Sequence, residues 1–126
     1  MSVIVVGYSA KPEGQAALDK AIDEAGRRRS QLVVVHTLES QDDVSTLAQT
    51  LAGTGLEHQV RAAPDPLDPA EEVLACAERN DAEFIVIGLR QRSPVGKLLL
   101  GSNAQRVLLD AACPVLAVKA APPVPR

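Results

Sequence analysis

The chain has 126 residues, a length that suits one domain with its own hydrophobic core and is too short for two. Hydrophobic residues make up 46 % of it but aromatic residues only 2 %, so we expect a core of valine, leucine, isoleucine and alanine. The net charge of −3 argues against proteins that bind nucleic acids or anionic membranes, because these present concentrated positive charge.

Several features of the sequence favour a cytoplasmic location. An apolar strand begins at residue 3, and no basic region or cleavage site of a secretion signal precedes it. The two cysteines, Cys76 and Cys113, lack metal-ligand spacing, and we interpret both as reduced residues that pack in the interior. No apolar run approaches the length that spans a membrane.

The first third of the chain predicts two strands separated by a helix. The apolar run 3–6 forms the first strand and ends at Gly7. Pro12 suits the first turn of the following helix, which ends in the cationic run 27–29, where positive charge complements the helix dipole. The second strand covers residues 32–35.

The middle third predicts a helix, an edge strand and a further helix. Residues 44–51 are apolar at helical spacing, and Gly53 ends this helix. The half-polar stretch 56–62 alternates poorly, which is typical of an edge strand. Asp68 and Pro69 then predict the N-cap and the first position of the third helix.

The last third contains a buried strand, a cationic loop and a helix. Residues 84–87 are continuously apolar, as in a strand covered on both faces, and Gly88 ends the strand. The loop 90–97 follows. Ser102 begins the fourth helix, where Gln105 completes a capping box. Two interpretations of the Ser102 hydroxyl stay open, namely capping alone or capping together with an anion contact.

A last strand over 114–118 completes the order, which predicts one α/β domain over residues 1–119 and an extended tail over 120–126. Alternating strands and helices form a doubly wound parallel sheet with helices on both faces. In such folds a ligand binds at the C-terminal edge of the sheet, where the strand order reverses. A helix that begins at this edge presents backbone N–H groups to an anion.

The block 84–118 resembles the C-terminal signature of the universal stress protein family. Nucleotide-binding members carry a glycine, two residues, a second glycine, nine residues, and then a glycine followed by serine or threonine. Gly88 and Gly101-Ser102 stand at the first and last of these positions, and Gln91 replaces the middle glycine. The resemblance implies a five-stranded parallel sheet of order 3-2-1-4-5 with an adenine nucleotide alpha hydrolase-like fold.

The candidate site combines residues found by their chemistry with residues implied by the resemblance. A glycine lets phosphate oxygens approach the backbone, and an arginine neutralises their charge. The resemblance implies that Thr37 lies beside adenine and that Ser9 stands where nucleotide-binding relatives carry aspartate. The candidate nucleotide-binding residues are Ser9, Thr37, Gly88, Arg90, Gly101, Ser102 and Asn103.

The resemblance implies a stress-response protein that binds ATP, with or without Mg²⁺, or a related adenine nucleotide, and that forms a homodimer through strand 114–118. Ser9, Gln91 and Ala104 depart from the family pattern in one pocket, so two interpretations stay open. One is a weakened or altered nucleotide site. The other is a member that has lost the nucleotide and acts through dimerisation and contacts with partner proteins.

An enzyme ranks last among the interpretations. We identify no general base and no metal-binding carboxylate, so a slow ATPase is the only activity considered, and no catalytic residue is assigned. Neither histidine, His36 or His58, belongs to a metal-binding pattern, and we interpret His36 as a packed residue at the end of a strand.

Overall fold

The computed structural model describes residues 2–91 and 98–120. Residues 92–97 of the predicted cationic loop and residues 121–126 of the predicted tail lie outside these residues. The parallel strands of the sheet are β1 (Val3–Tyr8), β2 (Gln31–His36), β3 (His58–Ala62), β4 (Phe84–Gln91) and β6 (Val115–Lys119). The helices are α1 (Pro12–Arg28), α2 (Gln41–Ala52), α3 (Pro69–Arg79) and α4 (Ser102–Asp110).

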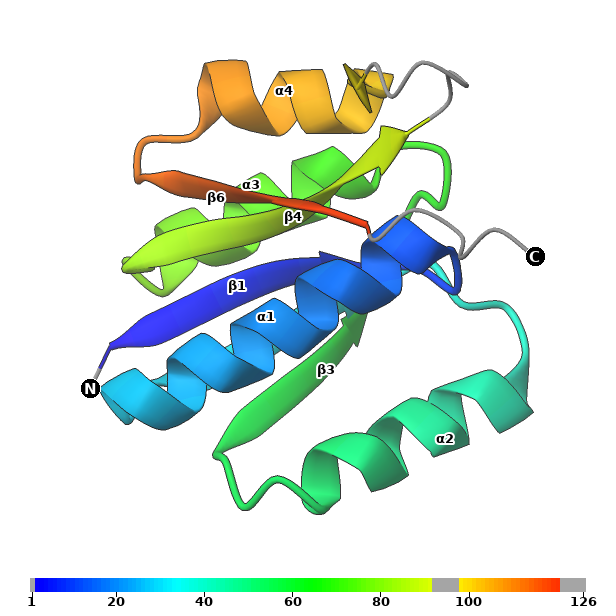
Figure 1. Cartoon of the computed structure of the whole chain (residues 1–126), viewed down its shortest axis with the longest axis vertical. Coiled ribbons are helices and arrows are strands. Elements are labelled where there is room, and N and C mark those ends of the chain that lie inside the picture. The colour runs from blue at the N-terminus through cyan, green and yellow to red at the C-terminus, as the bar shows by residue number, and fades with distance from the viewer. Residues whose placement is uncertain (1, 92–97, 121–126) are drawn as a thin grey trace, which may run out of the picture.

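The strand order β3-β2-β1-β4-β6 confirms the predicted sheet, with β6 as the fifth parallel strand. The order reverses between β1 and β4, where Val5 lies opposite Ile85. The edge position of β3 is also confirmed, since β3 pairs with β2 alone within the described part of the chain. Figure 1 shows α1 crossing one face of the sheet and α3 covering the other.

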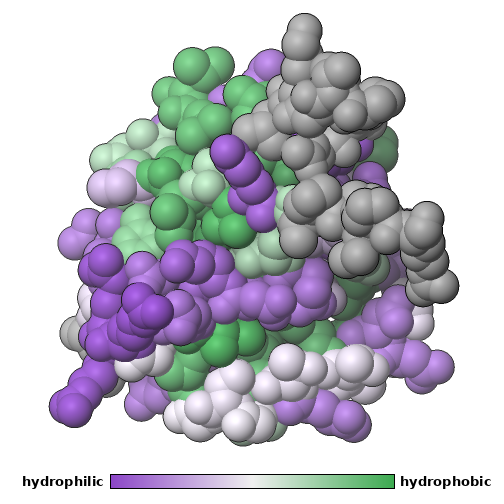
Figure 2. Space-filling model, in the orientation of Figure 1, coloured by the Kyte–Doolittle hydropathy of each residue, from purple (hydrophilic) through white to green (hydrophobic). Residues whose placement is uncertain are grey.

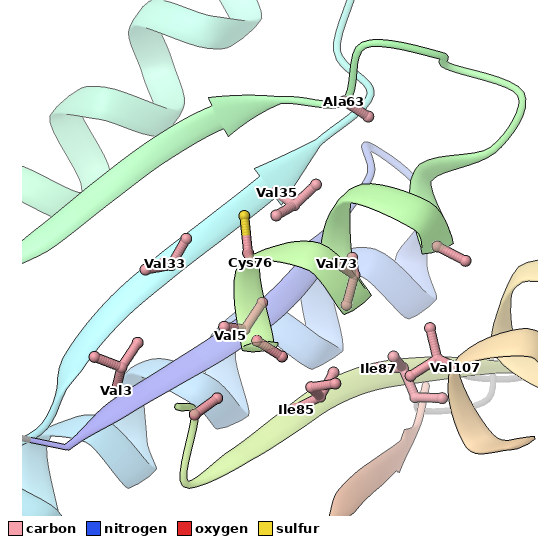
Figure 3. Packing of buried hydrophobic residues seen from close by; sticks show 13 residues of the cluster. Val3, Val5, Val33, Val35, Ala63, Val73, Cys76, Ile85, Ile87 and Val107 are labelled. Carbon is pink, nitrogen blue, oxygen red and sulfur yellow. The ribbon is translucent and has the colours of Figure 1, made fainter. Parts of the chain in front are cut away.

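The side chains of the central strands alternate between two apolar layers, as the two-residue period of a strand requires. Ile4 and Val6 face α1 and α2, where they pack with Leu18 and Leu51. The residues that alternate with these along each strand, such as Val5 and Ile85, face α3 and α4, and several of them are shown in Figure 3. Both faces of the sheet are therefore covered, which explains the continuously apolar runs in its sequence.

The prediction that Gly88 ends the fourth strand is wrong. β4 continues through Gly88, which lies opposite Val118 of β6, and it ends at Gln91. Beyond the parallel sheet, the end of β4 pairs antiparallel with the two-residue strand β5 (Leu98–Leu99). The strand continues because β6 pairs with it as far as Leu89, and β5 then pairs with Arg90 and Gln91.

Gly88 has a different structural role, since it allows close contact between β4 and the first turn of α1. A Cβ atom at Gly88 would overlap the backbone carbonyl of Glu13. A Cβ at Gly14 would likewise overlap Ser9, in the turn between β1 and α1. The two glycines therefore let the N-terminus of α1 lie directly against the point where the strand order reverses.

His36 ends β2 as a buried residue, as the packing interpretation predicts. Its Nδ1 atom accepts a hydrogen bond of 3.1 Å from the backbone N–H of Leu38, so this nitrogen carries no proton. Burial lowers the pKa of the imidazole below its ordinary value. A neutral His36 therefore stabilises the turn that contains Thr37.

We expect Gly88→Ala to destabilise the protein by about 2 kcal/mol or more, because the new methyl group must displace the backbone of α1. Gly26→Ala, in the last turn of α1, is the matched control: its Cβ would meet nothing within 4 Å. This control should gain about 0.5–1 kcal/mol from helix propensity. Urea denaturation gives the free energy of unfolding of both variants. Equal stability of Gly88→Ala and wild type would contradict the packing argument.

We expect acid to destabilise the fold through His36. The unfolded chain takes up a proton with a pKa near 6.5, above the folded value, so the free energy of unfolding falls as the pH drops below 6.5. One pH unit below that value, the loss reaches at most about 1.4 kcal/mol. His36→Asn keeps a side-chain acceptor for Leu38 but does not titrate, so urea denaturation at several pH values should show a flatter profile.

Candidate functional site

A cleft lies at the C-terminal edge of the sheet, between the ends of the central strands and the N-termini of three helices. Its inner compartment has a volume of about 150 Å³ and contacts mostly apolar side chains. Its outer compartment has a volume of about 290 Å³ and is lined by polar and apolar groups in nearly equal measure, including the charged residues Lys11, Glu13 and Arg90. The compartments are contiguous because they share Ser9, Glu13, Thr37, Pro69, Gly88, Asn103 and Ala104.

The inner compartment has an apolar wall made by three elements. Val73 of α3, Ile87 of β4 and Val107 of α4 approach one another there, as Figure 3 shows. Val35 of β2 also lines this compartment. Such a surface suits an apolar or aromatic group that excludes water.

The candidate residues predicted from the sequence all line the outer compartment. They come from four separate parts of the chain: the turn after β1, the turn after β2, strand β4, and the start of α4. The topology brings these parts together because the C-terminal ends of parallel strands meet at one edge. The contribution of each residue to binding stays a prediction.

Three helices begin at this cleft without a capping bond from their own N-cap side chain. Their N-cap residues are Lys11 for α1, Asp68 for α3 and Gly101 for α4. By contrast α2, which contributes no residue to the cleft, begins with Ser40, whose hydroxyl accepts a hydrogen bond from the N–H of Asp43. The first-turn N–H groups of a helix have no intrahelical partner, so such groups from three helices lie near the cleft.

The predicted capping box at Ser102 is wrong. Gly101 is the N-cap, with an extended backbone (φ −68°, ψ 164°), and Ser102 is the first helical residue. The backbone N–H of Gln105 donates to the carbonyl of Gly101, and Gly101, which has no side chain, makes no side-chain capping bond. The Ser102 hydroxyl therefore lies at the outer compartment without serving as the cap of α4.

Two side chains of α4 form hydrogen bonds with the N-terminal end of α3. Asp68 is the N-cap of α3 as predicted, but its carboxylate accepts a 2.6 Å bond from the guanidinium of Arg106. Oδ1 of Asn103 accepts a 3.3 Å bond from the N–H of Ala70, in the first turn of α3. These two bonds join the helices that form one wall of the cleft, and they assign the Asn103 carbonyl a structural role.

The guanidinium of Arg90 lies beside the N-terminus of α4. A Cβ atom at Gly101 would lie 3.2 Å from Nη2 of Arg90, so the bare α-carbon makes room for the charge. The first turn of α4 contains no acidic residue, whereas the first turns of α1, α2 and α3 each contain one or two. Positive charge at the positive end of a helix dipole is unfavourable unless an anion lies between them.

Two charged residues of the cleft, Lys11 and Glu13, were missed as candidates. Lys11 lines the outer compartment and Glu13 lines both compartments. Neither belongs to the glycine motif. The signal for them is topological: Pro12 marks the start of α1, and the residues around a helix start that follows β1 lie at the ligand edge of the sheet.

Within residues 2–91 and 98–120, no group of three His, Cys, Asp or Glu side chains could hold a metal ion. No helix in that part of the chain has the length and apolar character to cross a membrane. Cys76 is buried, and burial together with the nearby Glu72 carboxylate raises the pKa of its thiol, as expected of a packing residue.

Comparisons with known proteins agree with the fold. The sequence model of the "Universal stress protein family" matches residues 1–68 and 65–119. A universal stress protein of Mycolicibacterium smegmatis is 43% identical, with 93% of this chain and 97% of the relative covered.

Two solved structures of universal stress protein from Archaeoglobus fulgidus, one of them in complex with dAMP, superpose on this chain with TM-scores of 0.70 and 0.66. Their identities are 30% and 26%, and each comparison covers 94% of this chain and 98% of the other. The chain therefore belongs to the universal stress protein family.

Proposed function

We propose that this protein binds an adenine nucleotide in the cleft, with the phosphate in the outer compartment and the base toward the inner one. The observation that carries the proposal is the position of Arg90 against the N-terminus of α4. In the nucleotide-free protein, the guanidinium of Arg90 lies next to the positive end of the α4 dipole, and this lowers stability. A bound phosphate would interact favourably with both the guanidinium and the helix N-terminus. The dAMP complex of the relative from Archaeoglobus fulgidus supports the class of ligand.

The proposed phosphate contacts come from α4 and from the cations beside it. Backbone N–H groups of Ser102 and Asn103 belong to the first turn, where no intrahelical acceptor is available. The guanidinium of Arg90 is suited to bidentate phosphate contacts, and the Ser102 hydroxyl can donate a further bond. Lys11 adds positive charge from the start of α1.

The base end of the ligand is proposed to lie against the apolar wall of Val73, Ile87 and Val107. Ser9 and Thr37 line both compartments and can offer hydrogen bonds between the two ends. ATP, with or without Mg²⁺, is one proposed ligand, and a nucleotide with fewer phosphates is another. We propose binding rather than catalysis, because Glu13 is the one carboxylate among the described residues that line the cleft.

We also propose a homodimer through the outer edge of β6, the assembly that would remain if the nucleotide site were lost. Within the described part of the chain β6 pairs with β4 alone, so its second edge has no strand partner there. Leu109 of α4 is 83% exposed and Leu108 is 40% exposed. Figure 2 shows apolar surface in this upper region of the molecule, which suits burial between two copies.

We expect Arg90→Gln to weaken nucleotide binding by about tenfold or more, because a charged phosphate contact is lost. The same substitution should raise the stability of the nucleotide-free protein by about 0.3–1 kcal/mol, since it removes a cation from a helix N-terminus. Isothermal titration with AMP and ATP measures the first effect, and thermal denaturation without ligand measures the second.

Arg27→Gln is the matched control for Arg90→Gln. It makes the same change in net charge at the C-terminal end of α1, where Arg27 pairs with Asp23 across 3.3 Å. Its nucleotide affinity should equal that of wild type. Equal affinity of Arg90→Gln and wild type would refute the proposed phosphate contact, and a flat titration of nucleotide-free wild type at millimolar AMP and ATP would refute the function.

We expect Ala117→Glu to give a monomer, because the exposed Ala117 lies in β6 and a charge there would be buried at the proposed interface. Gln59→Glu places the same charge at an exposed position of β3, the opposite edge strand, and should leave the dimer intact. Light scattering reports both masses. A wild-type protein of monomer mass, or an Ala117→Glu variant of dimer mass, would contradict the proposed interface.

A further inference from the structure

Glu13 is a cleft residue that a pure anion site does not need. It occupies the first turn of α1, is partly buried, and lines both compartments. Its position is set by tight packing, because its backbone fills the space beside Gly88 and its own Cβ lies 3.0 Å from where a Cβ of Gly88 would be. The backbone and Cβ of Glu13 are therefore held at the wall shared by the two compartments.

The charges around the cleft are arranged unevenly. The outer compartment contacts Arg90, Lys11 and the first turn of α4, all of which attract an anion. Glu13 has the opposite charge, and an ionised carboxylate only accepts hydrogen bonds. A complementary ligand therefore has one strongly negative end, together with hydroxyl or amino groups that can donate to Glu13.

We infer that Glu13 determines ligand specificity: its carboxylate accepts hydrogen bonds from hydroxyl or amino groups of a bound nucleoside and repels additional phosphates, so that the cleft takes a nucleoside monophosphate in preference to a triphosphate. The inference rests on the proposed function, since it concerns the same cleft. A single phosphate, with a charge of about −2, matches the two cations and the helix terminus. Each further phosphate adds negative charge next to the carboxylate.

Glu13 also has an ordinary structural role, since an acid in the first turn stabilises a helix through its dipole. Glu71 has the same role in α3, close to the wall of the cleft, but it lines neither compartment. A comparison of variants at Glu13 and Glu71 therefore distinguishes a general effect of charge at a helix N-terminus from a direct contact with the ligand. Glu71→Gln is the matched control for Glu13→Gln.

The test is calorimetric titration of nucleotide-free protein with AMP, ATP and inorganic phosphate, without divalent metal and at one ionic strength. Wild type should bind AMP more tightly than ATP. Glu13→Gln should shift the ratio of the two affinities toward ATP by about fivefold, because one repulsive charge is removed. Glu71→Gln should keep the wild-type ratio.

The outcomes separate this inference from the proposed function. If wild type binds none of the three ligands, the proposed function fails. If wild type binds AMP but the affinity ratio is the same in Glu13→Gln, or shifts equally in Glu71→Gln, Glu13 does not set specificity while the nucleotide site stands. Thermal denaturation of each variant confirms that the proteins compared are folded.

Discussion

The close contact between the first turn of α1 and strand β4 at Gly88 sets the geometry of the whole cleft. Parallel strands leave a gap where their order reverses, and the backbone of Glu13 enters that gap until it meets the bare α-carbon of Gly88. This contact brings Glu13 and Lys11 to face the start of α4 across the outer compartment. Gly88, the first glycine of the family motif, therefore allows α1 and β4 to pack in close contact because it has no side chain.

Much of the fold followed from the sequence because its signals are local. Apolar runs and helical periodicity predicted the order of elements, and poor alternation predicted the edge position of β3. The continuation of β4 to Gln91 was not predictable, because it depends on pairing with the two-residue strand β5. Likewise both Gly101 and Ser102 are acceptable N-caps, and the path of the chain into α4 decides between them.

The sequence predicted part of the candidate site, with Ser9 and Thr37 implied by the family resemblance. The glycine motif identified the wall made by β4 and α4, where Arg90 and Ser102 lie. The opposite wall follows no motif, and Glu13 belongs to the cleft only because α1 packs against β4. Asn103 was predicted from its backbone position, yet its side-chain carbonyl binds the N–H of Ala70, a long-range contact that spacing along the chain does not reveal.

The bonds from Asn103 to Ala70 and from Arg106 to Asp68 have a mechanical consequence. They tie the N-terminal ends of α3 and α4 to each other through side chains, independently of the sheet. Exposed Leu109 lies near the far end of α4. The nine-residue helix α4 therefore carries part of the cleft wall at its start and part of the exposed apolar surface at its end.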